Sequence, residues 1–151
     1  MRPLCLLFFA LMATAHLLAN TCPAMANSDI TVDVEVINAL RTSSEVDPQL
    51  TGLAREVGPV LNFTGFKLLK KSQVPLKTGE EKEVFLSGNR RLTLKLKGFE
   101  TGQARLELRI FRDRTEIFST TLLLIDRGGA IIGGPKLNKG VMLIRVQGKF
   151  G

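Results

Sequence analysis

The sequence predicts a mainly β fold: an antiparallel β-sandwich or partly open barrel of about seven or eight strands, with one amphipathic helix after the first strand. Three observations predict it. Apolar and polar residues alternate over most of the chain, turn residues recur at short intervals after Phe66, and only one segment has helical spacing. No low-complexity tract, heptad run or second domain interrupts this pattern in the 151 residues.

The first strand is predicted where valines alternate with polar residues between Thr31 and Val36. Successive side chains of a strand point to opposite faces, so the three valines share one face and Asp33 and Glu35 lie on the other. This pattern is typical of a strand that is buried on one side only.

The helix is expected to begin after Asp47, which is a favourable N-cap residue, with Pro48 at the first helical position. Apolar residues then recur with the spacing of one helical face, at Leu50, Leu53, Ala54 and Val57. Pro59 disfavours the helical conformation in the residue before it, so we expect the helix to end at Gly58-Pro59.

A meander of short strands is predicted from Phe66 onward. The strands are expected near residues 66–71, 82–87, 90–98, 104–112, 116–125, 129–133 and 140–147. The turns between them are expected at Ser87-Gly88-Asn89, Thr101-Gly102, Arg112-Asp113-Arg114 and Asp126-Arg127-Gly128-Gly129. The glycines of 128–135 lack the spacing of a phosphate-binding loop and instead predict a tight turn, a short strand and a bulge.

The N-terminus predicts an exported protein. Arg2 supplies a positive start, residues 4–13 are apolar, and Ala24-Met25-Ala26 is a signal-peptidase site. Cleavage after Ala26 would leave one β-rich domain, residues 27–151, in the periplasm or outside the cell. No apolar run in that domain reaches 18 residues, so we expect no transmembrane segment in the mature chain.

A lipoprotein is the alternative reading of the N-terminus, with Cys22 acylated as the first residue of the mature chain. The residues before it, Ala19-Asn20-Thr21, depart from the motif that such sites require. Signal-peptidase cleavage after Ala26 is therefore the preferred interpretation.

Residue types missing from the mature chain limit its chemistry. Both cysteines and the only histidine lie in the predicted signal peptide, at Cys5, Cys22 and His16. Zinc and copper sites depend on these residue types, and catalytic triads depend on an imidazole, so we predict no metal, no cofactor and no catalytic residue. The enzymatic alternative is a small periplasmic hydrolase or lyase that uses only Asp, Glu, Lys and Arg.

The acids that such an enzyme could use are concentrated at Glu80, Glu81 and Glu83, beside Thr78-Gly79. A catalytic carboxylic acid needs a pocket that raises its pKa. We therefore interpret these three residues as part of a solvated turn.

Positive charge is the other compositional signal. After cleavage, 20 Lys and Arg residues (21 less Arg2) would face 14 acids, a net charge of +6. Arg91, Lys95 and Lys97 alternate with leucines, which places them on one solvent-facing side of a strand, as a candidate anion-binding face. The structural alternative is an ordinary solvated face, partly paired to Glu107 on a neighbouring strand. Nucleic acid is a disfavoured partner, because the chain has no Trp or Tyr for base stacking.

Three short motifs also carry a resemblance: Val-Asp-Pro-x-Leu at Val46 to Leu50, Phe-Lys-Leu-Leu at Phe66 to Leu69, and the paired glycines of Gly128 to Pro135. In these motifs the chain resembles uncharacterised secreted proteins of Gram-negative bacteria. The resemblance implies an envelope location and a compact β domain, without a known activity. We therefore expect an exported, non-enzymatic cell-envelope protein that binds a protein partner or an anionic envelope polymer or lipid.

Overall fold

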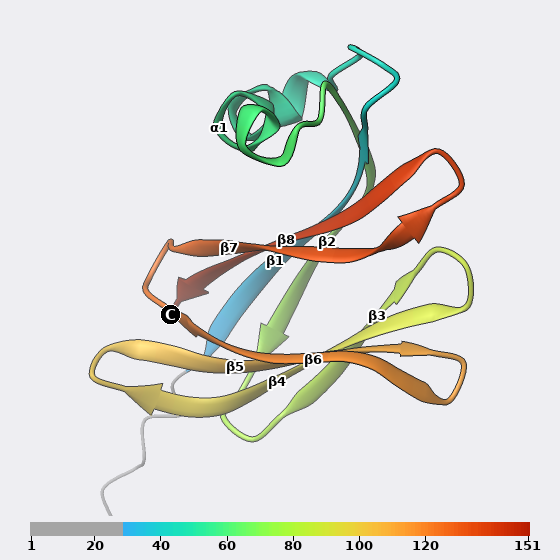
Figure 1. The fold of residues 1–151 in the computed structure, drawn as a ribbon. Coiled ribbons are helices and arrows are strands. Elements are labelled where there is room, and N and C mark those ends of the chain that lie inside the picture. Colours follow the sequence, from blue (N-terminus) through green and yellow to red (C-terminus); the bar gives the residue numbers. More distant parts are fainter. Residues whose placement is uncertain (1–28) are drawn as a thin grey trace, which may run out of the picture.

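The computed structural model describes residues 29–151, which form eight strands and one helical segment (Figure 1). The predicted signal peptide and Cys22 lie outside the described residues. In chain order the elements are β1 (Ile30–Leu40), a 3-10 turn (Pro48–Leu50), α1 (Thr51–Leu61), β2 (Gly65–Leu76), β3 (Glu81–Leu86), β4 (Arg90–Glu100), β5 (Gln103–Arg112), β6 (Thr115–Leu124), β7 (Gly129–Leu137) and β8 (Gly140–Phe150).

The strands form two antiparallel sheets of four. The first sheet has the order β2-β1-β8-β7, and the second sheet has the order β3-β4-β5-β6. Each strand pairs only with a neighbour in sequence, apart from β1 and β8, which bring the two ends of the chain together. No ladder joins β2 to β3 or β6 to β7, so the sheets remain separate layers (Figure 1). This confirms the predicted fold class, as a sandwich and not a closed barrel.

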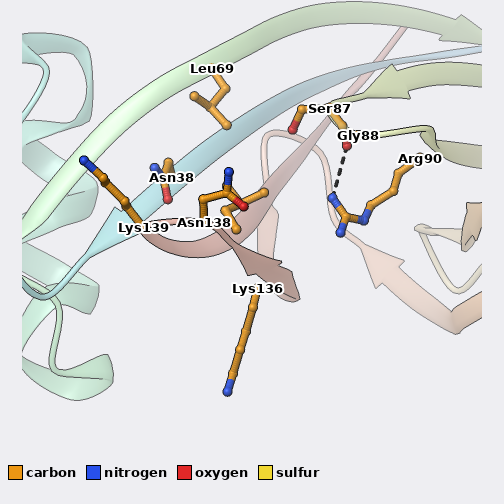
Figure 2. Close-up of a pocket in the computed structure, with 9 residues that line it drawn as sticks. Asn38, Leu69, Ser87, Gly88, Arg90, Lys136, Asn138 and Lys139 are labelled. Atoms are coloured by element: carbon orange, nitrogen blue, oxygen red, sulfur yellow. Dashed lines mark hydrogen bonds between the residues drawn. The ribbon is translucent and has the colours of Figure 1, made fainter.

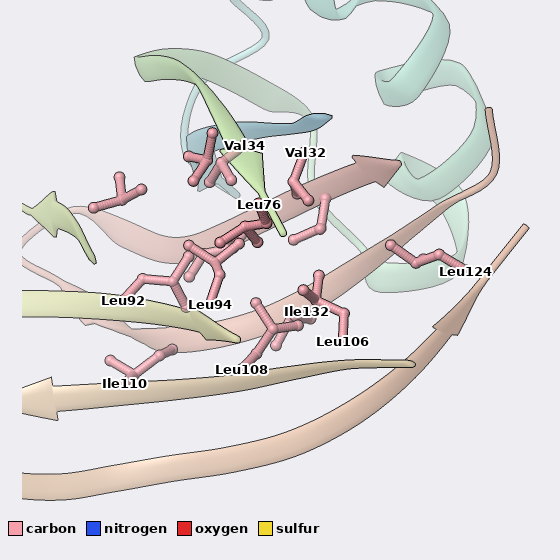
Figure 3. Packing of buried hydrophobic residues seen from close by; sticks show 14 of the residues in the cluster. Val32, Val34, Leu76, Leu92, Leu94, Leu106, Leu108, Ile110, Leu124 and Ile132 are labelled. Atoms are coloured by element: carbon pink, nitrogen blue, oxygen red, sulfur yellow. The ribbon is translucent and has the colours of Figure 1, made fainter. Parts of the chain in front are cut away.

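The core between the layers consists of the apolar positions of the alternating strands (Figure 3). Val32 and Val34 of β1 face Leu92 and Leu94 of β4 across the interior, and each is fully buried. Burial of this kind supplies most of the stability of a small domain, at roughly 1.5–3 kcal/mol per large apolar side chain. The period-two pattern of the sequence therefore predicted the core-facing side of each of these strands.

The helical segment begins after Asp47, as predicted, but its first turn and its last residue differ from the prediction. Pro48–Leu50 is a 3-10 turn that leads into α1, and the Asp47 carboxylate does not cap it. This carboxylate instead accepts a hydrogen bond from the Leu68 backbone N–H at 2.6 Å, which ties the start of the helix to β2.

The predicted end of the helix at Gly58-Pro59 is wrong. α1 continues through Pro59 to Leu61 and ends at Asn62, which adopts the left-handed conformation with φ 56°. Proline disfavours a preceding helical residue partly through contact with its Cβ, and Gly58 has no Cβ. A side chain at Gly58 would also lie 3.0 Å from the Phe63 carbonyl oxygen, so this glycine allows the chain to turn closely after the helix.

The helix packs against the outer face of the first sheet, as Figure 1 shows above β1, β2 and β8. Leu50 and Leu53 are buried there against Ile37, Phe66 and Leu143. The first sheet is consequently covered on both faces near the helix. In the described part of the chain, no helix combines the length and the apolar character needed to cross a bilayer.

Candidate functional site

The three basic residues predicted to share a face do so. Arg91, Lys95 and Lys97 lie on the outer side of β4, and the leucines between them are buried on the inner side. The structure therefore places this candidate anion-binding face on the exposed surface of the second sheet.

Acidic residues occupy the same surface. Glu83 of β3 lies 3.5 Å from Arg91, and Glu107 of β5 lies 3.3 Å from Lys97, both measured between side-chain nitrogen and oxygen atoms. Lys95 stands in register between Glu81 and Glu107. The expected pairing to Glu107 is confirmed for Lys97. Because charges of both signs alternate over this face, their fields largely cancel at a distance.

The three glutamates near residue 80 do not share a turn. Only Glu80 lies in the β2–β3 turn, where its carboxylate accepts a hydrogen bond from the Lys77 backbone N–H, which lowers the pKa of Glu80. Glu81 and Glu83 lie on β3, so their assignment to the turn was wrong. Glu81 pairs with Arg109 at 2.6 Å across the second sheet. These acids therefore form ion pairs on an open sheet surface.

A second group of acids lies on the outer face of the first sheet. Asp33 and Glu35 point outward from β1, yet Glu35 is only 5% exposed. Glu35 pairs with Lys71 of β2 at 3.1 Å and with Arg145 of β8, and Asp33 pairs with Lys149 of β8 at 2.6 Å. β1 is a central strand of the first sheet, so long basic side chains from both neighbours cover its acids.

The environment of Asp33 determines what it can do chemically. Burial acts to raise the pKa of Asp33, but hydrogen bonds from Lys149 and Gln73, together with the charges of Lys149 and Lys71, outweigh burial and lower this pKa below 3.8. A general acid needs the opposite shift, towards a raised pKa. Asp33 is therefore suited to a permanent ion pair and not to proton transfer near neutral pH.

Unpaired positive charge gathers at one end of the sandwich. Residues 29–151 contain 20 Lys and Arg, and nine of them lie within 4.0 Å of an acid. Of the other eleven, eight lie at the end formed by the β3–β4, β5–β6 and β7–β8 turns. We call this group the cationic end: Arg41, Lys67, Lys70, Arg90, Arg112, Arg114, Lys136 and Lys139.

Few acids oppose the cationic end. Asp113 is the only acidic residue in the three turns. Residues 1–28 contain no Asp or Glu, so the N-terminal segment has no acidic side chain to offer to the cationic end. Arg90 and Arg112 are in register on neighbouring strands, so like charges stand side by side. The excess charge of the chain is therefore concentrated here.

An open hollow of about 570 Å³ lies between the sheets at this end (Figure 2). Arg90, Lys136 and Lys139 line it together with polar Asn38 and apolar Leu69. Arg90 donates a hydrogen bond to the Ser87 carbonyl oxygen at 3.2 Å, which fixes the guanidinium beside the turn. The side chains of Lys136 and Lys139 point away from each other (Figure 2).

A second hollow of about 630 Å³ continues from the first, because Lys136, Asn138 and Lys139 line both. Arg41 and Phe63 also line it, with the Arg41 guanidinium 5.2 Å from the centre of the Phe63 ring. The charged groups thus surround a wide, partly apolar opening and do not converge on one point. Such an arrangement suits a ligand with several separated anionic groups better than a single small anion.

The sequence contained a signal for this site, but a search for clusters of basic residues along the chain does not find it. Alternate turns of a meander lie at the same end, and basic residues flank each of the turns at 87–89, 113–114 and 138–139. Arg91, Lys95 and Lys97 are closer together in sequence, but their neighbours in space are acids.

Comparison with known proteins identifies no relative of this chain: no protein-family model matches it, nor does any curated protein or solved structure.

Proposed function

We propose that the protein is an exported, non-enzymatic cell-envelope protein that binds an anionic envelope component, such as anionic lipid or lipopolysaccharide, through its cationic end. The observation that carries the proposal is the group of eight basic residues at one end of the sandwich, none of which lies within 4.0 Å of an acid among residues 29–151. Export is supported by the signal-peptide pattern of residues 1–26.

The electrostatic argument depends on spacing. Arg90 stands in register with Arg112 and lines one hollow with Lys136 and Lys139, so the fields of neighbouring charges add at this end. Such fields extend over roughly a Debye length, about 8 Å at physiological salt. Their summed field raises the local concentration of anions and accelerates encounter with an anionic surface. Exposed Leu69 and half-buried Phe63 lie beside the charges and offer apolar contact to lipid.

The non-enzymatic part of the proposal is supported by the state of the buried acids. Asp33 and Glu35 are each held by basic side chains, and the pKa of Asp33 is lowered. The lowered pKa of Asp33 is the opposite of the shift that a proton-donating carboxylic acid needs at neutral pH.

Binding can be tested by co-sedimentation of the exported protein with phosphatidylglycerol vesicles, with phosphatidylcholine vesicles as the uncharged reference. Arg90→Gln, Lys136→Gln and Lys139→Gln together should reduce binding several-fold. The matched control neutralises the paired face, with Arg91→Gln, Lys95→Gln and Lys97→Gln, and should bind more strongly than the cationic-end variant.

Salt provides the second arm of this test. Raising salt from about 50 mM to about 500 mM shortens the Debye length severalfold, so binding should weaken steeply. Equal binding by the wild type and the cationic-end variant would overturn the assignment to this end. If the control variant loses more vesicle binding than the cationic-end variant, the anion-binding surface is instead the face of Arg91, Lys95 and Lys97.

Export can be tested separately by the intact mass of the protein recovered from the cell envelope. A chain that begins at Asn27 is expected from cleavage after Ala26. A diacylglycerol-modified Cys22 at the N-terminus would instead establish the lipoprotein alternative.

A further inference from the structure

Four strands of the sandwich lie at sheet edges: β2 and β7 in the first sheet, and β3 and β6 in the second. An edge strand exposes unpaired backbone N–H and C=O groups, to which another strand can add. Proteins that remain monomeric protect such edges with proline, charged side chains, bulges or short strands. These four edges differ sharply in that respect.

Three of the edges carry protection. β3 has six residues and begins with the charged run Glu81–Glu83. β2 contains Pro75 and the basic pair Lys70-Lys71. β7 contains Pro135, and its register with β8 is interrupted between Gly133 and Lys136. Each of these edges is therefore a poor template for a further strand.

β6 has little of this protection. Its register with β5 shifts once, between Ile110 and Phe111, which leaves Ile117 near the start of β6 unpaired, and the pairing is regular from Phe118 to Leu124. β6 is ten residues long, and no charged residue or proline occurs from Ile117 to Ile125. The segment contains two Ile, two Thr and Phe118, residue types that favour strands. Leu123 is 51% exposed and Ile125 is 57% exposed, although both are large apolar residues. Among residues 29–151, β6 pairs with β5 on one side and with no strand on the other.

We propose that the free edge of β6 pairs with β6 of a second copy of this chain, antiparallel and about a two-fold axis. The two second sheets would then join into one continuous sheet of eight strands. A second copy is the fitting partner because a segment without charge meets itself without like-charge contacts. The molecule is strongly basic elsewhere, so an uncharged edge is where two copies approach at least electrostatic cost.

The antiparallel direction follows from the position of the cationic end. β6 begins at that end, next to Arg112 and Arg114, and runs away from it. Antiparallel pairing separates the two cationic ends by about one strand length, roughly 33 Å for ten residues. Parallel pairing would bring them together. Ser119, Thr121 and Leu123 point to the outer face, where they would meet uncharged side chains of the partner.

Thr121→Lys tests the proposal with little risk to the fold. Thr121 is exposed, and it stands in register with Glu107 of β5, which gives a new ammonium group an acidic neighbour. At the dimer contact the same change would add a charge from each copy. Thr78→Lys in the β2–β3 turn makes the same chemical change away from β6 and serves as the control.

The measurement is sedimentation velocity of the exported protein between about 1 and 500 μM, a range that covers weak to moderate association. Wild type and Thr78→Lys should shift from monomer to dimer as concentration rises, and Thr121→Lys should remain monomeric. A wild type that stays monomeric throughout, or a Thr121→Lys variant that dimerises like the wild type, would overturn the proposal.

Amide hydrogen exchange on the wild type keeps the test decisive if the variant does not fold. Protection of the β6 amides should rise with protein concentration, while protection of the β3 amides should not. Equal behaviour of both edges would count against β6 as the interface. Neither measurement involves an anion, so failure here and failure of the proposed anion binding are distinguishable.

Discussion

The Lys149 ammonium lies 2.6 Å from the carboxylate of Asp33, across the pairing of β8 with β1. Together with Glu35, Lys71 and Arg145, these residues form a network of ion pairs on the outer face of the first sheet. The acids all come from the central strand β1, and the bases come from its two neighbours. The network therefore stabilises the register of three strands at once.

The lowered pKa of Asp33 predicts that stability depends on pH in the acid range. A depressed folded-state pKa means that the unfolded chain binds the proton first as pH falls below 3.8. The contribution is fully present well above that value and is lost as pH falls through the lower folded-state pKa. In urea unfolding, Asp33→Asn should be less stable than the wild type at about pH 7 and closer to it at about pH 3.

Glu116→Gln is the control for this measurement, because Glu116 is exposed and has no ion pair in the described part of the chain. Its difference from the wild type should be small at both pH values. A difference between Asp33→Asn and the wild type that is independent of pH would contradict the assignment.

Glu35 is buried and its basic partners are partly exposed, so removing a partner should destabilise the fold more than neutralising Glu35 does. Arg145→Ala leaves the buried carboxylate of Glu35 with Lys71 alone, and should lower the free energy of unfolding by about 2–3 kcal/mol. Glu35→Gln leaves two basic side chains that already contact water, and should cost about 1 kcal/mol. Urea unfolding at neutral pH measures both. The reverse order would show that the bases, not the acid, are the groups that need a partner.

Because α1 packs on the first sheet, substitutions on its buried face should destabilise the protein more than substitutions on its exposed face. Leu53 is buried against the first sheet, whereas Val60 is 82% exposed. Leu53→Asp should lower the free energy of unfolding by at least about 3 kcal/mol, because it would bury an unpaired charge. Val60→Asp, which introduces the same charge on the exposed side of the helix, should stay within about 0.5 kcal/mol of the wild type. Similar melting temperatures for both variants would mean that the helix does not stabilise the sandwich.

The features that were predictable from the sequence are local ones. The side of β4 that carries Leu92 and Leu94 follows from the period of two, because alternation depends only on neighbouring residues. The end of α1 was missed because Gly58 removes the contact through which Pro59 normally stops a helix. That exception depends on one missing Cβ.

The features that were not predictable depend on which strands meet. Burial of Glu35 requires bases on both adjacent strands, and these lie 36 and 110 residues away along the chain, at Lys71 and Arg145. The cationic end has the same origin, since residues of three separate turns share it only after the meander has formed. Pairing of Arg91 with Glu83 likewise became visible only once β3 and β4 were aligned.

Neutralising charges at the cationic end and on the outer face of the second sheet should change the free energy of unfolding in opposite directions. Lys136 and Lys139 have no acidic partner within 4.0 Å in the described part of the chain, and they add to a group of like charges at the cationic end. Replacing both with Gln should raise the free energy of unfolding by a few tenths of a kcal/mol, because it relieves repulsion. Arg109 lies 2.6 Å from Glu81 and 3.6 Å from Glu107, so Arg109→Gln should lower the free energy of unfolding by about 0.5–1 kcal/mol. Both differences should shrink between about 50 and 500 mM salt, since screening weakens attraction and repulsion alike.

Urea unfolding at the two salt concentrations measures both differences in the free energy of unfolding. A double variant less stable than the wild type at low salt would show that Lys136 and Lys139 contribute contacts to the fold, and that their charges do not oppose it.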